Sequence, residues 1–130
     1  AEAEALAAQG TVELSLVAGL PDDVLGEIEA IQARGGKVVV VDPRRTGTAD
    51  VADEWVPIVP GTDAALLLAM VQVLFADGLV DLGGLADLVE GLDDLEAAAA
   101  SWTPERVAST CGIDAATIRR TRPADRLLSR

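Results

Sequence analysis

The segment that most constrains the fold is a run of valines at residues 38 to 41, which follows Gly35-Gly36-Lys37 and ends at Asp42-Pro43. A strand with one face in water alternates apolar and polar residues, whereas a parallel strand covered on both faces is apolar throughout. The glycines and the Asp-Pro pair bound the run as turn residues do. Residues 37 to 41 therefore predict a buried strand of a parallel sheet.

The segments around this run complete a βαβ unit. Residues 11 to 18 alternate apolar and polar side chains, which predicts a first strand. Residues 21 to 34 begin with a proline and carry apolar residues at helical spacing, which predicts a helix. Residues 55 to 59 predict a short third strand at the sheet edge, because their proline cannot donate to a ladder. Residues 42 to 54 are expected to be the connecting loop.

The second half of the sequence is predicted to be helical. Residues 64 to 76 are too rich in Ala and Leu for a strand and predict a buried helix, with Thr62 or Asp63 as its N-cap. Shorter helical pieces are expected at residues 82 to 89, at residues 92 to 100, after Thr103 as a cap with Pro104 in the first position, and at residues 114 to 122.

These elements predict an α/β fold: a Rossmann-like, three-layer domain with a short parallel sheet and a helical C-terminal half. At 130 residues, half of them hydrophobic, the chain has the length and apolar content of one domain, residues 1 to 130. Residues 1 to 10 are expected to form a frayed N-terminus and residues 121 to 130 a divergent tail.

Charge and composition exclude several classes of function. A net charge of -12 repels nucleic acid and anionic membranes, and no apolar run reaches the roughly 18 residues of a membrane span. We therefore expect no nucleic-acid partner, no membrane insertion and a cytoplasmic location. The chain has no His and a single Cys, Cys111, so we expect no metal ligands or disulfide, and a small buried residue at Cys111.

Two loops occupy positions where open parallel sheets bind ligands, beyond strand ends and at helix N-termini. The first follows the valine strand and reads Asp42-Pro43-Arg44-Arg45-Thr46. Its carboxylate can accept from a ribose hydroxyl or a guanine edge, and its arginines can bind phosphate in bidentate fashion. The alternative is that Asp42 opens an Asx turn and the arginines are solvated.

The second loop, Pro60-Gly61-Thr62-Asp63, enters the long predicted helix. Backbone N–H groups at a helix start favour an anion, and Asp63 can accept from guanine nitrogens, whereas the alternative is a plain N-cap. No Gly-x-Gly-x-x-Gly motif follows either early strand, because the first turn reads Gly19-Leu20-Pro21-Asp22-Asp23. An ordinary NAD-binding domain is therefore disfavoured.

Three motifs stand in the order and spacing of one known family. They are residues 36 to 46, the pair Ala52-Asp53, and residues 56 to 66, which contain the Pro-Gly-Thr-Asp loop. The likeness continues through Asp77-Gly78-Leu79-Val80-Asp81 and the later helices to about residue 120. The chain resembles the molybdopterin guanine dinucleotide oxidoreductases, the family of formate dehydrogenases, periplasmic nitrate reductases and dimethyl sulfoxide reductases.

In that family the two loops line the guanosine end of one cofactor dinucleotide. The resemblance implies this role for Asp42, Pro43, Arg44, Arg45 and Thr46 and for Gly61, Thr62 and Asp63. The two aspartates would accept from sugar hydroxyls or guanine N–H groups, while Arg44 or Arg45 and the helix amides would face phosphates. Molybdenum would be held by the pterin and not by this chain.

Three departures from the family indicate a fragment that is not catalytic alone. The turn at Gly19-Leu20-Pro21-Asp22 replaces an Asn-Pro loop that touches the pterin. The family's molybdenum ligand and iron–sulfur cysteines lie in N-terminal segments with no counterpart here. Thr121-Arg122-Pro123 interrupts a helix that normally continues. We expect the remaining domains or subunits of an oxidoreductase as partners.

Two other interpretations remain open. The chain could be a non-catalytic α/β interaction module, or a degenerate fragment of that family, that binds a partner through exposed apolar surface. It could also be a different nucleotide-binding domain that converged on the Asp-Pro-Arg-Arg loop, in which case adenine nucleotides would be preferred over guanine nucleotides.

Overall fold

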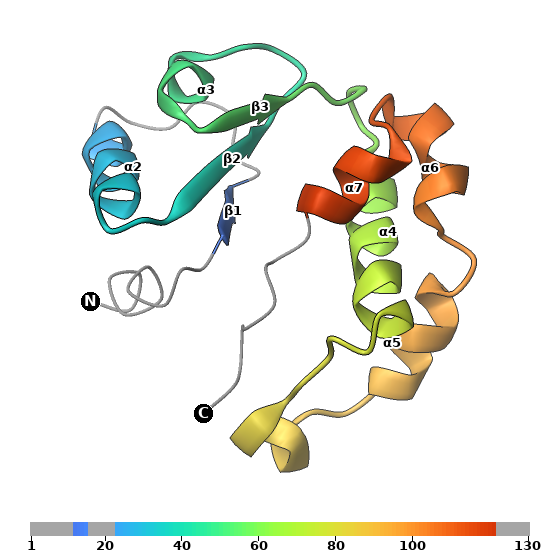
Figure 1. Ribbon diagram of the computed structural model, residues 1–130. Coiled ribbons are helices and arrows are strands. Elements are labelled where there is room, and N and C mark those ends of the chain that lie inside the picture. The colour runs from blue at the N-terminus through green and yellow to red at the C-terminus, as the bar shows by residue number, and fades with distance from the viewer. Residues whose placement is uncertain (1–11, 16–22, 122–130) are drawn as a thin grey trace. The chain divides into compact units, whose positions relative to one another are not determined.

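The computed structural model describes residues 12–15 and 23–121 (Figure 1). The contacts divide the chain into two compact units, Ala1–Ile58 and Val59–Arg130. The single domain over residues 1 to 130 stays a prediction. The predicted frayed N-terminus, residues 1 to 10, and residues 122 to 130 of the predicted tail lie outside the described part of the chain.

The first unit contains a parallel three-stranded sheet in the order β1-β2-β3. The strands are β1 Val12–Ser15, β2 Lys37–Val41 and β3 Glu54–Val56. The strand predicted at residues 37 to 41 is confirmed at both ends, and β1 lies within the strand predicted at residues 11 to 18. The edge position predicted for the third strand is confirmed as well.

The bounds predicted for the third strand were wrong. β3 begins one residue earlier than expected and ends at Val56, which lies opposite Val41, the last residue of β2. The ladder stops there because the following residue, Pro57, has no N–H to donate. The strand expected over residues 55 to 59 is therefore only three residues long.

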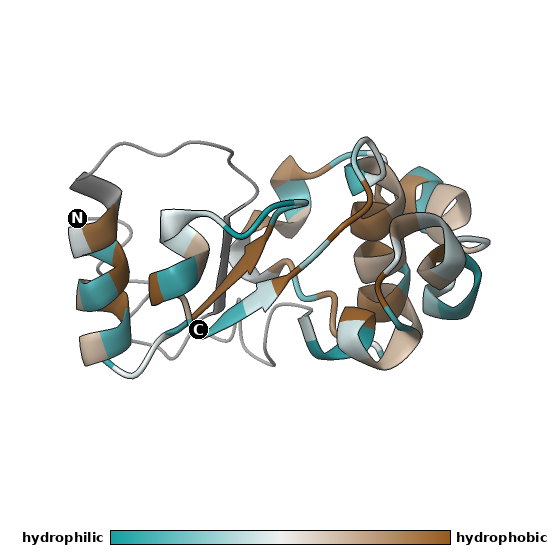
Figure 2. Ribbon diagram, turned by 90° about the horizontal axis from the view of Figure 1, so that it is seen from above, coloured by the Kyte–Doolittle hydropathy of each residue, from teal (hydrophilic) through white to brown (hydrophobic). Residues whose placement is uncertain are grey.

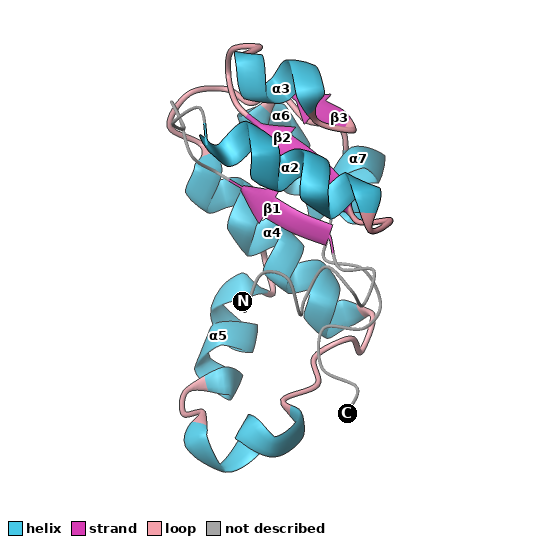
Figure 3. Ribbon diagram, turned by 90° about the vertical axis from the view of Figure 1, so that its left-hand side faces the viewer, coloured by secondary structure: helices cyan, strands magenta, loops and turns pink. Residues whose placement is uncertain are grey.

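Two helices of the first unit connect the strands, α2 Asp23–Ala33 and α3 Gly47–Val51. α2 confirms the helix predicted at residues 21 to 34, whereas α3 lies where only a loop over residues 42 to 54 was expected. At five residues α3 is too short to show apolar periodicity. Both helices contact β2 and each other, so they cover the same side of the sheet (Figure 3).

The core of the first unit is built on β2, whose four valines are 2% to 5% exposed. Ile28 and Ile31 of α2 pack on Val38, with Ala52 partly buried against them. β2 is accordingly apolar along most of its length (Figure 2). The complete burial predicted from the valine run is confirmed.

A polar clamp fixes the start of β2. The Asp53 carboxylate oxygen Oδ2 accepts hydrogen bonds from the Val38 amide at 2.8 Å and from Gln32 Nε2 at 3.1 Å. The Asp53 amide in turn donates to the Val38 carbonyl at 3.0 Å. The hydrogen bond from the Val38 amide, and after it the hydrogen bond from Gln32, lowers the pKa of Asp53. The Ala52-Asp53 motif therefore joins β2, β3 and α2, which is a structural role.

The second unit is a group of helices around α4 Asp63–Ala76, which packs against three others (Figure 1). These are α5 Leu92–Ala99, α6 Pro104–Cys111 and α7 Ala115–Thr121, and the 3₁₀ helix η1 Gly83–Leu88 precedes α5. The largest fully buried side chains are Leu66, Pro104, Val107, Cys111 and Ile118. The helical second half and the buried position of Cys111 are confirmed.

The capping signals read from the sequence are confirmed at α6, and α7 lies within the helix predicted at residues 114 to 122. The Thr103 hydroxyl accepts from the Arg106 amide at 3.4 Å, and Pro104 occupies the first turn of α6. Asp114 Oδ1 accepts from the Thr117 amide at 2.9 Å and caps α7. Within the described residues, no helix combines the length and the apolar character that a membrane span requires.

Candidate functional site

Asp42 is held at the carboxyl end of β2 by three hydrogen bonds. Its amide donates to the Val56 carbonyl at 3.3 Å, and its carbonyl accepts from Trp55 Nε1 at 3.0 Å. Its carboxylate oxygen Oδ1 accepts from the Arg44 amide at 2.7 Å. The residue is 8% exposed. Asp42 is therefore a fixed acidic residue at the position where parallel sheets place ligand-binding groups.

The bond from the Arg44 amide forms the Asx turn that was the alternative reading of this loop. The turn uses one carboxylate oxygen of Asp42. The other oxygen, Oδ2, has no hydrogen-bond partner among the described residues. The turn therefore orients the carboxylate and leaves one acceptor for a further donor.

The two arginines after Asp42 differ in their surroundings. Arg45 Nε lies 2.7 Å from Asp50 Oδ1, and the Arg45 guanidinium carbon lies 5.9 Å from the centroid of the Trp55 ring. The guanidinium of Arg44 has no such partner in the described part of the chain. Both side chains are exposed. One cation of this loop is thus held in place, and the other is solvated.

Thr46 has a structural task in the same loop. Its hydroxyl accepts from the Ala49 amide at 3.3 Å, and it is the N-cap of α3. Pro43 is exposed and makes no polar contact through its side chain. Of the five residues predicted for the first loop, Asp42, Arg44 and Arg45 carry the groups that can face a ligand.

The second loop leaves the start of α4 without a side-chain cap. Thr62 is the N-cap residue, as predicted, but its hydroxyl donates back to the Val59 carbonyl at 2.6 Å and accepts no helix amide. Gly61 turns the chain with φ +79°, and Asp63 is exposed in the first turn. The plain side-chain cap considered from the sequence is therefore not what the structure contains. The first two amides of α4, those of Asp63 and Ala64, remain open to a ligand or to solvent, whereas the Ala65 amide donates to the Thr62 carbonyl at 3.1 Å.

The end of α6 positions the start of this loop. The Val59 amide donates to the Cys111 carbonyl at 2.9 Å. Gly112 follows with φ +75°, and a Cβ at this position would lie 3.1 Å from Val59 Cγ2. The absence of a side chain at Gly112 thus lets the chain entering the Pro-Gly-Thr-Asp loop pass close to α6.

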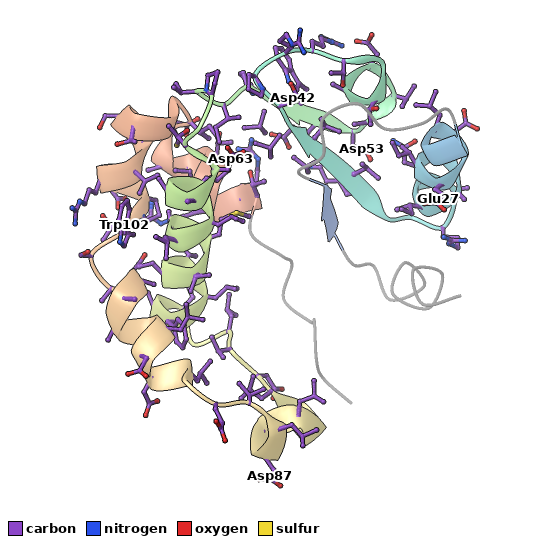
Figure 4. All side chains as sticks on the ribbon, turned by 180° about the vertical axis from the view of Figure 1, so that it is seen from behind. Glu27, Asp42, Asp53, Asp63, Asp87 and Trp102 are labelled. Carbon is purple, nitrogen blue, oxygen red and sulfur yellow. The ribbon has the colours of Figure 1, made fainter. Side chains whose placement is uncertain are left out.

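The structure brings the predicted site residues together in two groups, one in each unit. The first group lies at the carboxyl end of β2, where Figure 4 labels Asp42, whereas the labelled Asp53 belongs to the clamp at the other end of the strand. The second group surrounds the labelled Asp63 at the start of α4. No group of three or more His, Cys, Asp or Glu in the described ranges could hold a metal ion.

Sequence reasoning missed two residues that support the first group, Trp55 and Asp50. In the structure Trp55 Nε1 donates to the Asp42 carbonyl, and its ring lies near the Arg45 guanidinium. Asp50 lay in the predicted loop and gained a fixed position only with α3. The Thr46-Gly47-Thr48-Ala49-Asp50 sequence carries an N-cap signal that could have indicated this helix.

Relatives of known identity match most of the described chain, although no family model matches it. The F420-dependent formate dehydrogenase subunit alpha of Methanocaldococcus jannaschii is 38% identical over 81 residues, which are 62% of this chain and 12% of that protein. The molybdopterin-containing subunit of the arsenate respiratory reductase of Chrysiogenes arsenatis is 42% identical over 69 residues, 53% of this chain and 8% of that protein.

A solved structure agrees with these matches. Acetylene hydratase from Pelobacter acetylenicus superposes with a TM-score of 0.75 and 33% identity, covering 84% of this chain and 16% of that one. The chain thus spans between 8% and 16% of the length of these relatives. Over the matched residues the chain is a member of the molybdopterin oxidoreductase family, as the motif series predicted, and it corresponds to one part of those longer proteins.

Proposed function

We propose that this chain binds the guanosine end of a molybdopterin guanine dinucleotide within a larger molybdenum-dependent oxidoreductase. The observation that carries the proposal is Asp42, a buried carboxylate fixed at a strand end with one oxygen unused and two arginines following it. The family membership supports the same conclusion. The guanine dinucleotide form of the cofactor and the binding role are both part of this proposal.

The groups present fit a guanosine phosphate by their chemistry. Asp42 Oδ2 and the exposed Asp63 are acceptors, which suit sugar hydroxyls and guanine N–H groups. The guanidiniums of Arg44 and Arg45 and the uncapped amides of α4 are donors, which suit phosphate oxygens. α4 has 14 residues, so its dipole is fully developed.

The cofactor, when bound, would supply the metal and the redox chemistry, and this chain would supply binding and orientation. The described residues contain no cluster that could ligate molybdenum or an iron–sulfur centre. Any such centre belongs to other segments of a parent enzyme. The isolated chain is accordingly proposed to bind and not to turn over substrate.

We also propose that the sheet is the beginning of a Rossmann-like, three-layer arrangement in one domain. Sequential parallel strands connected by α2 and α3 support this reading, since doubly wound nucleotide-binding folds start in the same way. The remaining domains or subunits of the oxidoreductase would complete the layers. A cytoplasmic location is part of the same proposal.

The test is a calorimetric titration of the chain with GDP. Asp42→Asn keeps an oxygen for the Arg44 amide but replaces the unused acceptor with an NH₂ group, so we expect GDP binding to weaken about tenfold. Arg44→Ala with Arg45→Ala should weaken it at least as much. Lys37→Ala removes one positive charge at the opposite end of β2 and should change the affinity by less than about twofold.

Three outcomes would contradict the proposal. A folded chain that shows no saturable binding at millimolar GDP has no working guanosine site. An equal loss in Lys37→Ala would show that only the general charge matters. Tighter binding of ADP than of GDP would favour the different nucleotide-binding domain.

The second candidate function is docking of a protein partner, and one surface favours it. In residues 80 to 95, η1 has no buried residue, and five large apolar side chains are exposed: Val80, Leu85, Leu88, Val89 and Leu95. Apolar surface of this kind is typical of an interface. Sedimentation of the chain over a range of concentrations tests this candidate, because self-association lost in Leu88→Asp would support it.

A further inference from the structure

Four residues of the first unit form a continuous series of contacts around Arg45. Asp50 Oδ1 lies 2.7 Å from Arg45 Nε, and the Arg45 guanidinium carbon lies 5.9 Å from the Trp55 ring centroid. Trp55 Nε1 donates to the Asp42 carbonyl at 3.0 Å. The side chain that holds Arg45 is therefore itself bonded to the residue that carries the proposed site.

The two contacts of Arg45 use different parts of the guanidinium. Asp50 occupies Nε, while the Trp55 ring lies beside the planar group, as in a cation–π contact. Neither Nη1 nor Nη2 has a hydrogen-bond partner among the described residues. The edge formed by these two nitrogens can bind a phosphate in bidentate fashion.

We propose that Trp55 and Asp50 are positioning residues, which hold Arg45 so that its Nη1 and Nη2 atoms face a phosphate of the bound nucleotide. The proposal rests on the nucleotide site proposed above and adds to it the residues that prepare one cation. Arg44 lacks these contacts, so the two adjacent arginines have different roles.

The physical advantage is a smaller loss of side-chain freedom on binding. A free arginine gives up many rotamers when it binds a phosphate, whereas an arginine already held on a ring and a carboxylate gives up fewer. The ion pair with Asp50 is exposed on both sides, at 60% and 62% of the side-chain surfaces, so it orients Arg45 more than it stabilises the fold.

The unliganded chain gives the first test, by the nitrogen-15 NMR signal of Arg45 Nε–Hε. We expect this signal to be shifted and protected from solvent exchange, and to move to the position of a solvated arginine in Asp50→Ala and in Trp55→Leu. Trp102→Leu is the matched control, because Trp102 has its own arginine, Arg106, at 5.3 Å. An Arg45 signal like that of a solvated arginine in the native chain would overturn the proposal.

The second test is a double-mutant cycle read by titration with GDP and with guanosine. Trp55→Leu should weaken GDP binding about three- to tenfold and change guanosine binding by less than about twofold. In the Arg45→Ala background the same substitution should have no further effect on GDP. Trp55→Phe keeps an aromatic face and should retain affinity within about twofold of the native chain.

The outcomes separate this proposal from the one before it. If GDP binds but Trp55→Leu weakens GDP and guanosine equally, or does so without Arg45, Trp55 only supports the fold and the positioning role is refuted. If the native chain binds no GDP, the nucleotide site and the phosphate-facing role of Arg45 both fail, even where the NMR signal shows a held guanidinium. Should Trp55→Leu not fold, Trp55→Phe and Asp50→Ala carry the test.

Discussion

The contact between Gly112 and Val59 makes a sharp prediction about how α6 positions the loop before α4. Gly112→Ala adds a methyl group 3.1 Å from Val59 Cγ2, closer than the roughly 3.5 to 4.0 Å that two carbons prefer. Val59 cannot simply withdraw, because its amide is bonded to the Cys111 carbonyl and its side chain is β-branched. We therefore expect the substitution to destabilise the second unit.

The magnitude follows from two contributions. Left-handed backbone costs an alanine about 1 to 2 kcal/mol, of which about 0.4 to 1 kcal/mol is offset by the lower entropy of the unfolded chain. The tight contact adds about 0.5 to 1 kcal/mol, which is less than the roughly 1 to 3 kcal/mol of overpacking in a core, because Val59 is half exposed. The sum for Gly112→Ala is a loss of about 0.5 to 2.5 kcal/mol.

Gly91→Ala is the matched control for the backbone contribution. Gly91 has φ 78° and ψ 17°, against φ 75° and ψ 10° for Gly112, and a Cβ at Gly91 would meet nothing within 4 Å. It should therefore cost about 0.5 to 1 kcal/mol less than Gly112→Ala. In a Val59→Ala background, which removes Cγ2, this difference should disappear.

Urea denaturation followed by the fluorescence of Trp102 measures both variants. The chain has two tryptophans, one in each unit, so Trp55→Phe leaves a reporter of the second unit only. A loss of about 1 kcal/mol should also lower the Tm by about 4 to 8 °C for a unit of this size. Equal losses for Gly112→Ala and Gly91→Ala would refute the idea that Val59 is confined by α6.

Three further predictions concern the two cores and the clamp on β2. Gly36→Ala should destabilise the first unit by about 1 to 3 kcal/mol, because its Cβ would lie 2.5 Å from Ile31 Cγ2. A Cβ at Gly26 in α2 would meet nothing within 4 Å, so Gly26→Ala should stabilise the same unit by about 0.5 to 1 kcal/mol. Chemical denaturation of both variants checks these opposite signs. Because the pKa of Asp53 is lowered, its contribution to stability is present above the unfolded pKa, near 3.8, and is lost as the pH falls through the lower folded pKa. Asp53→Asn should therefore flatten the acid side of a plot of unfolding free energy against pH, measured from pH 2 to 6. An unchanged acid side would contradict the clamp. Leu66→Ala should cost about 2 to 5 kcal/mol in thermal unfolding because Leu66 is 1% exposed, and a loss below 1 kcal/mol would show that α4 is not the centre of its unit.

The sequence predicted those parts of the molecule whose signals lie within a few residues of one another. The β-branched run defined β2, and the Ala- and Leu-rich run defined α4 to within one residue. Thr103 and Pro104 marked the start of α6. Apolar patterns and capping signals involve residues close together in the chain, so they can be read from the sequence alone.

The candidate site could be predicted only in part from local sequence patterns. The motif order indicated which residues stand at the strand end and at the start of α4, and the family assignment that it implied is confirmed. It did not indicate that the Thr62 hydroxyl bonds to Val59, or that Trp55 and Asp50 surround Arg45. These partners could not be predicted because the hydrogen bonds of a side chain depend on which donors and acceptors folding places near it.

The sequence by itself thus determined the class of the fold, the buried strand, the main helices and the family. Only the tertiary structure decided that β3 ends at Val56, and that Asp53 bonds to the start of β2 while Asp42 lies at its end. Several of the decisive pairings join residues 13 to 52 positions apart, such as Asp42 with Trp55 or Val59 with Cys111. Such distances carry no periodic signal, since each pairing exists only once the packed core has brought its two members together.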